Sequence, residues 1–238
     1  VLFRSPYCFK NYILSFNGEI FNYIDLKHSL IEAGYKFETT SDTEVLIKLF
    51  DFEGTSSFKK LSGIFAVSIY DTKLKKLYLI RDAVGVKPLY YYHESNTKKF
   101  IYSSLINSLL LSLNEKKLNH NALISYSNFN RNDYRETFFH NIFKVLPGEL
   151  IEVSNGEYKR LKFIDYEFKN INKNYNTSKE INHHFSKQFI SDVPVALSLS
   201  GGIDSSIIFH ELLKNKGTQF TSYSVLFKDS SKYSQDHE

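Results

Sequence analysis

Two motifs in this chain combine residue types that could do chemistry, and the sharper one spans residues 198–206, Ser-Leu-Ser-Gly-Gly-Ile-Asp-Ser-Ser. Two adjacent glycines let the backbone approach a ligand closely and turn its N–H groups toward one point. The hydroxyls of Ser200, Ser205 and Ser206 supply further donors. The loop contains no lysine, so it is not a Walker A loop. Its composition predicts a site for a phosphate chain; the alternative is a tight turn in which Asp204 only favours the first turn of a helix.

The residues around this loop predict the elements that position it. An apolar run at 193–197 precedes the loop and a helix-like run at 207–213 follows it, which predicts strand, loop and helix. The N-terminus of such a helix carries partial positive charge that favours an anion. Residues 220–227 predict the next parallel strand of a doubly wound sheet. We therefore expect an α/β doubly wound domain to begin here.

The second motif, Asn17-Gly18-Glu19, lies in the first half of the chain, where strands and helices are mixed. Residues 12–16 predict a strand and Asn17-Gly18-Glu19 a turn after it, since Asn-Gly is a common turn pair. Ser41 followed by Glu44 has the spacing of a capping box, with Asp42 in the first helical turn. Further strands are expected at 63–70, 76–81 and 100–104. This order predicts an α+β layered sandwich.

Five motifs follow one another along the chain, and together they resemble one family: F-N-G-E-I-x-N-Y, S-D-T-E-V, G-x-F-A, R-D-x-x-G-x-K-P-L-Y-Y and S-G-G-x-D-S. The order is similar to that of the glutamine-dependent asparagine synthetases. In that family a class II glutamine amidotransferase domain precedes a pyrophosphate-loop synthetase domain that uses ATP. The resemblance implies an N-terminal-nucleophile-type αββα sandwich, followed by the start of an adenine nucleotide hydrolase-like doubly wound domain.

The resemblance also implies domain limits. Residues 6–165 would form the glutaminase domain, 166–178 a linker and 179–238 the start of the synthetase domain. We interpret residues 1–5 as a non-native artefact, because they lack periodicity and match what a translated sequencing adapter would encode. The chain is interpreted as a fragment truncated at both ends.

Carried over to this chain, the family motifs assign roles to single residues. The Asn17 side-chain amide and the Gly18 N–H would form an oxyanion hole, which stabilises the tetrahedral intermediate of amide hydrolysis. Glutamine would be bound by Asn17, Gly18, Glu19 and Asp42. The ATP-binding residues implied are Leu199, Ser200, Gly201, Gly202, Asp204, Ser205 and Val225. Asp204 would also contact Mg²⁺ held by the pyrophosphate.

The chain departs from the family at the nucleophile, which is an N-terminal cysteine that uses its own α-amino group as the base. Cys8 is the single cysteine, but it lies next to the Asn17 strand and has no free α-amino group. We interpret it as a small apolar residue beside a strand. The chain as printed is therefore expected to lack glutaminase activity, and its parent gene is expected to encode a cysteine directly after the initiator methionine.

Arg81 and Asp82 are interpreted as a structural ion pair rather than as catalytic groups.

Composition excludes several classes of function. The net charge is +4 from 30 basic and 26 acidic residues, with no basic block among the aromatics, so nucleic acid is not an expected partner. No apolar run reaches membrane-spanning length, so no membrane contact is expected. One cysteine fits a reducing cytoplasm. The expected partners are glutamine, aspartate and ATP, and a homodimer is compatible with the family.

The lead hypothesis is ATP-dependent synthesis of asparagine from aspartate via β-aspartyl-AMP, with channelled ammonia from glutamine. One alternative is an amidotransferase of the same fold that acts on another carboxylate, such as a polysaccharide sugar acid. Another is a non-catalytic module built on a decayed glutaminase domain. We expect the acceptor pocket that would decide between them to lie beyond residue 238.

Overall fold

The protein is described by a computed structural model that covers residues 5–131, 134–164, 185, 194, 196–216 and 220–225. The chain separates into two compact units, Val1–Phe168 and Lys169–Glu238. Each is described by itself. The expected linker at 166–178 lies outside the described residues.

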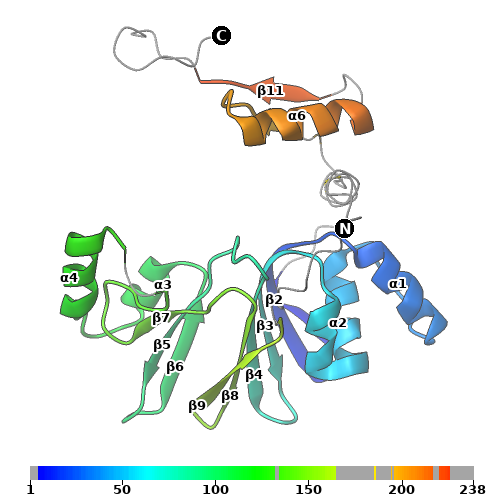
Figure 1. The fold of residues 1–238 in the computed structure, drawn as a ribbon. Helices are drawn as coiled ribbons and strands as arrows, with labels where there is room; N and C mark the ends of the chain where they lie inside the picture. Colours follow the sequence, from blue (N-terminus) through cyan, green and yellow to red (C-terminus); the bar gives the residue numbers. More distant parts are fainter. Residues whose placement is uncertain are drawn as a thin grey trace, which may run out of the picture. The chain divides into compact units, whose positions relative to one another are not determined.

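The first unit contains two antiparallel sheets (Figure 1). The larger has the order β1-β2-β3-β4-β8-β9, formed by Tyr7–Phe9, Tyr12–Ile20, Gly63–Asp71, Lys76–Arg81, Glu149–Ser154 and Glu157–Lys162. The smaller has the order β6-β5-β7, formed by Lys99–Ser103, Tyr90–Glu94 and Ile142–Lys144. The helices are α1 (Tyr23–Glu32), α2 (Asp42–Glu53), α3 (Ile106–Leu111) and α4 (His120–Phe129), with a 3-10 helix η1 (Gly54–Lys60) after α2.

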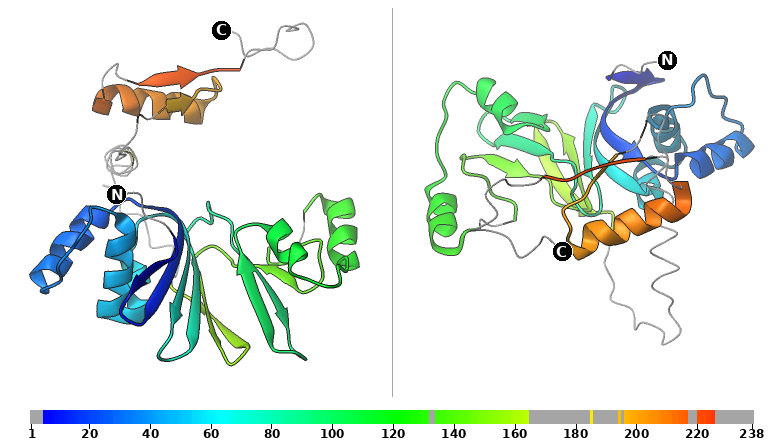
Figure 2. Two further views of the ribbon diagram at one scale, coloured as in Figure 1. Left: turned by 180° about the vertical axis from the view of Figure 1, so that it is seen from behind. Right: turned by 90° about the horizontal axis from the view of Figure 1, so that it is seen from above.

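The strand period of two places alternate side chains in different cores. On β3, Phe65 and Val67 join a core that includes Ile47 and Phe50 of α2. Ala66 between them joins Leu79 and Tyr91 in a second core, which lies between the two sheets. A third core packs Tyr92 and Ile142 of the smaller sheet against Leu109 of α3. Helix, sheet, sheet and helix are thus stacked, and the expected αββα sandwich is confirmed (Figure 2).

The turn expected at Asn17-Gly18-Glu19 is wrong, because β2 continues through these residues to Ile20. Their backbone pairs with β3 in the register Asn17↔Ala66, Gly18↔Phe65 and Glu19↔Ile64. Gly18 has a φ of +150°, and a Cβ at this position would lie 2.1 Å from the Ile64 carbonyl oxygen. Glycine is therefore required here by contact with the neighbouring strand rather than by a turn.

Gly18→Ala is expected to destabilise the first unit by about 2–3 kcal/mol, because the added methyl group must displace strand backbone. Gly34→Ala is the matched control. Gly34 also has a positive φ, +93°, but nothing lies within 4 Å of its Cβ position. Urea unfolding of both variants measures the difference, and equal losses of stability would contradict the close approach of β3 to Gly18.

The loop after β4 is held by Arg81 and Asp82, but not as an ion pair. The Arg81 guanidinium donates to the carbonyls of Lys87, Val145 and Gly85 at 2.7–2.8 Å. The buried Asp82 carboxylate accepts the N–H groups of Phe65, Val84, Gly85, Val86 and Lys87 at 2.6–3.2 Å. The expected ion pair is therefore wrong, although both residues have the expected structural role.

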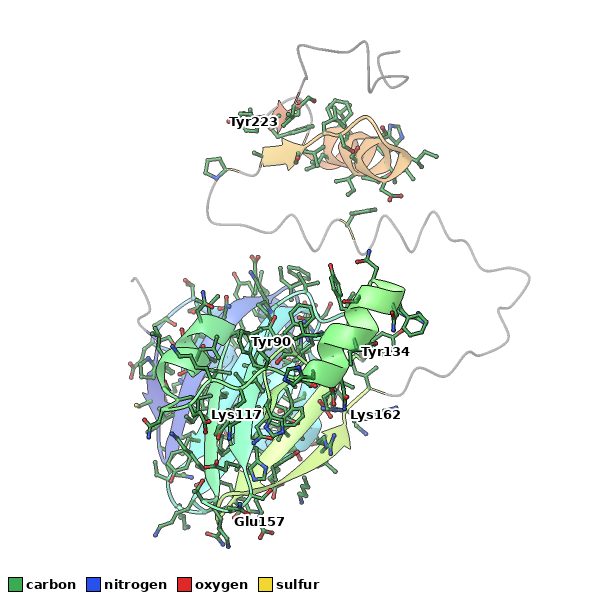
Figure 3. All side chains as sticks on the ribbon, turned by 90° about the vertical axis from the view of Figure 1, so that its left-hand side faces the viewer. Tyr90, Lys117, Tyr134, Glu157, Lys162 and Tyr223 are labelled. Atoms are coloured by element: carbon green, nitrogen blue, oxygen red, sulfur yellow. The ribbon has the colours of Figure 1, made fainter. Side chains whose placement is uncertain are left out.

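The second unit has the expected strand, loop and helix. β10 (Ala196–Ser198) is followed by α6 (Ile203–Lys216) and then by β11 (Thr221–Tyr223), which pairs parallel with β10. Figure 3 shows Tyr223 at the end of β11. The parallel strand is confirmed for 221–223, while residues 226 and 227 lie outside the described part.

Candidate functional site

The carboxyl end of β2 carries the residues expected to bind glutamine. Asn17 lies opposite Ala66, whose side chain is in the core between the sheets, so the Asn17 side chain is on this inner face. A hollow of about 260 Å³ opens there. Its lining comes from β2, β3 and β6 and from the segments beside them: Ser5, Ser15, Phe16, Asn17, Ala66, Val67, Ser68, Leu89, Tyr102, Ser103 and Ser104.

The pairing of β3 determines where the Gly18 N–H points. Phe65, opposite Gly18, uses its N–H and its carbonyl oxygen for Asp82, on the β4 side. In an antiparallel ladder the two strands alternate between bonded and non-bonded pairs, so Gly18 and Phe65 form a non-bonded pair. The Gly18 N–H is therefore directed away from β3, which leaves it available as a donor beside Asn17.

Asp42 joins this end of β2 from the first turn of α2. Its Oδ2 accepts the Ile20 N–H at 3.1 Å, which ties the start of the helix to the end of the strand that carries Asn17 and Gly18. Burial raises the pKa of the half-buried Asp42 carboxyl, against the opposing effect of hydrogen bonds from Ile20, Thr43 and Ser41. A cationic ligand would relieve this cost of burial. Glu19 is exposed on the same strand.

Glu44 is a residue whose role the sequence pattern misassigned. The Ser41 hydroxyl accepts the Thr43 N–H, and Glu44 does not close a capping box. Its fully buried carboxylate instead accepts the N–H groups of Glu38 and Thr39 and pairs with Lys48. Burial alone would raise the pKa of Glu44, but the hydrogen bonds from Lys48, Thr39 and Glu38 lower it from 4.5 to about 2.

This lowered pKa predicts a loss of stability in acid. A carboxyl whose pKa is lower in the folded state stabilises the fold above its unfolded value, and the effect disappears as the pH falls through the folded value. The contribution of Glu44 should therefore be complete above pH 4.5 and disappear toward pH 2.

Urea unfolding at pH 7 and pH 3 measures this contribution. The double variant Glu44→Gln/Lys48→Met, which leaves no buried charge unpaired, should lose less stability on acidification than the unsubstituted chain. The same loss in both proteins would assign the acid sensitivity to other carboxylates.

The phosphate-loop candidates lie together between β10 and α6. Gly201 has a φ of +83°, and nothing lies within 4 Å of its Cβ position, so the loop is open on that side. The Ser205 and Ser206 hydroxyls donate to the Gly202 carbonyl at 3.0 and 2.9 Å, and the Ser200 and Ser205 hydroxyl oxygens lie 3.1 Å apart. In this arrangement the donors left for a phosphate are mainly the backbone N–H groups of the loop and first helical turn.

The remaining candidates lie at the carboxyl ends of the two parallel strands. The Leu199 N–H donates to the Tyr223 carbonyl at 2.8 Å, and Val225 follows two residues later with 82% exposure. Ligands of open α/β sheets bind at this edge. Asp204 is exposed in the first turn of α6. Among the described residues no group of three or more His, Cys, Asp or Glu could hold a metal, so Asp204 fits Mg²⁺ only if ligand phosphates complete the coordination.

Cys8 lies within β1, opposite Ile13 of β2, and its side chain is exposed. It therefore belongs to the strand rather than flanking it.

In the part of the chain that the structure describes, no helix has the length and apolar composition needed to cross a membrane.

The family of this chain follows from its match to known domains. Residues 6–164 match the glutamine amidotransferase domain model, and the chain belongs to this family. Residues 178–238 match the asparagine synthase model.

The names of the relatives that the chain resembles combine asparagine synthesis with glutamine hydrolysis. The chain is 33% identical over 223 residues to "Asparagine synthetase [glutamine-hydrolyzing] 1" of Bacillus subtilis (strain 168), covering 89% of this chain and 35% of that protein. It is 31% identical over 208 residues to "Putative asparagine synthetase [glutamine-hydrolyzing] 2" of Methanocaldococcus jannaschii, covering 82% of this chain and 39% of that protein. The chain thus spans somewhat more than a third of the length of these relatives, and the resemblance to asparagine synthetases is confirmed.

Proposed function

We propose that this chain is part of a glutamine-dependent asparagine synthetase. The observation that carries the proposal is the convergence at the end of β2, where Asn17, Gly18 and Asp42 are held together by the β2–β3 pairing and the Asp42–Ile20 hydrogen bond. The asparagine synthase match of residues 178–238 and the similarity to the named relatives support aspartate as the acceptor of the ammonia.

In the proposed glutaminase reaction the chain binds glutamine and stabilises charge. Asp42 and Glu19 accept hydrogen bonds from the α-amino group. When a nucleophile adds to the side-chain amide carbon, the carbonyl oxygen becomes an oxyanion. The Asn17 amide and the Gly18 N–H donate to that oxygen. Their hydrogen bonds to the charged oxygen of the transition state are stronger than their hydrogen bonds to the neutral carbonyl of the bound substrate. Collapse of the intermediate, with a proton passed to the leaving nitrogen, releases ammonia and leaves a glutamyl group on the nucleophile, which water then hydrolyses to glutamate.

In the proposed synthetase reaction the second unit binds ATP at the carboxyl ends of β10 and β11. The loop N–H groups hold the β- and γ-phosphates, and Leu199 and Val225 lie beside the nucleotide. Mg²⁺, when bound, would neutralise the charge of the leaving pyrophosphate. Asp204 would share that ion with the phosphate oxygens. The aspartate side-chain carboxylate attacks the α-phosphorus of ATP, which gives β-aspartyl-AMP and pyrophosphate. Ammonia channelled from the first site then attacks the activated carbonyl to give asparagine and AMP.

The test is an assay of the full-length protein that contains this chain, with ATP, Mg²⁺ and aspartate. Asparagine and pyrophosphate should form in equal amounts with either glutamine or ammonia as nitrogen source. Pyrophosphate release with a sugar acid but not with aspartate would identify another acceptor. Absence of both glutamine hydrolysis and pyrophosphate release would favour a non-catalytic module. A cytoplasmic location and a homodimer complete the proposal and stay predictions.

A further inference from the structure

A buried ion pair on α2 begins two residues after Asp42 and spans one helical turn. Glu44 is fully buried and Lys48 is 5% exposed, and their side chains pair across a single turn. The Lys48 ammonium lies 5.1 Å from the centre of the Phe9 ring and 4.6 Å from that of Phe37. A buried ion pair gives little net stability, because desolvation of both charges offsets their attraction. Net stability therefore does not explain the pair, and its hydrogen-bond partners indicate a different role.

Both members of the pair hold the segment that leads into α2. Lys48 donates to the Lys36 carbonyl at 2.6 Å. Glu44 accepts the Glu38 and Thr39 N–H groups at 3.0 and 2.8 Å and the Thr39 hydroxyl at 2.6 Å. The backbone from 36 to 39 is thus fixed to the helix by one carboxylate and one ammonium group.

This fixed segment leads to Asp42, the first residue of α2. The Thr39 hydroxyl, which donates to Glu44, also accepts the Ser41 N–H at 3.2 Å, and the Ser41 side chain accepts the Thr43 N–H. Hydrogen bonds therefore run without a gap from the ion pair to both neighbours of Asp42. On its other side Asp42 is bound to Ile20.

We propose that Lys48 and Glu44 are positioning residues for the α-amino group of glutamine, which fix the Asp42 carboxylate through the 36–41 segment. This inference rests on the proposed glutaminase function. Neither residue touches the substrate. Their loss should weaken recognition of the α-amino group and leave the chemistry at Asn17 and Gly18 unchanged.

The test uses Lys48→Met in the full-length protein and two substrates, glutamine and its analogue without the α-amino group. We expect KM for glutamine to rise about tenfold with kcat within about twofold, because the displaced Asp42 carboxylate no longer accepts a hydrogen bond from the charged α-amino group. The kcat/KM for the analogue should not change, since that substrate never makes the contact. Lys48→Arg should restore part of the loss. Lys10→Met is the matched control: Lys10 lies 5.4 Å from the same Phe9 ring but pairs with Asp51.

An equal fall in kcat/KM for both substrates would overturn this inference and leave a general structural role for the pair. If Lys48→Met does not fold, the neutral pair Glu44→Gln/Lys48→Met is measured instead, with the same expected contrast between substrates. If the unsubstituted protein does not hydrolyse glutamine, the proposed function fails and this inference fails with it. Unchanged kinetics of both Lys48→Met and the double variant would overturn the inference alone.

Discussion

Asp204→Ala is expected to lower ATP-dependent synthesis by at least roughly three powers of ten with either nitrogen source, while glutamine hydrolysis stays measurable. The reason is charge. A phosphate chain carries several negative charges, and an acidic side chain in a loop of backbone donors would repel it unless a metal ion lies between them. Pyrophosphate release with aspartate, ATP and Mg²⁺ measures the effect.

Asp204→Asn is the matched control for this prediction. Asparagine has nearly the same shape but carries no charge to share a cation, and loss of the negative charge in the first turn of a helix costs only about 0.3–1 kcal/mol. If Asp204 only favours the first turn of α6, the asparagine variant should keep most of the activity. Near-normal pyrophosphate release from both variants would remove the main support for an adenylating enzyme.

Asn17→Ala should reduce glutamine-dependent turnover of the full-length protein by about 100- to 1,000-fold, the usual effect of losing one oxyanion donor. The fall should lie in kcat, since the donor acts on charge that develops only in the transition state. Ammonia-dependent synthesis should persist, because it uses the second unit.

The matched control is Asn22→Ala. The Asn22 amide donates to the Lys60 carbonyl at 2.8 Å and its oxygen accepts the Ser62 N–H at 2.9 Å. This variant loses stability for structural reasons and should keep its turnover. If glutamine- and ammonia-dependent activities of Asn17→Ala fell together, the assignment of two separate sites would be wrong.

The parts of the fold that the sequence predicted correctly are those set by local signals. The apolar run, the glycine pair and the helix-like run at 193–213 lie in one continuous stretch, so strand, loop and helix could be predicted there. The strands at 63–70 and 76–81 are mainly apolar runs joined by a short turn, and the structure places both with nearly these limits.

The errors arose where a distant partner overrides a local signal. Asn17-Gly18 is a turn pair by itself, but nine residues of β2 pair with β3, which lies about fifty positions further along the chain. Glu44 stands at capping-box spacing from Ser41, yet it bonds to the 38–39 backbone and to Lys48, because burial requires an opposite charge. Only the tertiary structure brings these partners together. The roles of Asn17, Gly18 and Asp204 stay predictions that the experiments above decide.

The Asp82 carboxylate has a consequence for how this protein can change over time. It accepts the backbone N–H groups of residues 84 to 87, so the side chains of Val84 and Val86 take no part in this anchoring, whereas Gly85 has no room for a Cβ. Val84 and Val86 are 78% and 54% exposed on this loop. Mutations at these two positions can therefore alter the surface chemistry while the backbone keeps its path, which makes the loop a place where related proteins can diverge in recognition without losing the fold.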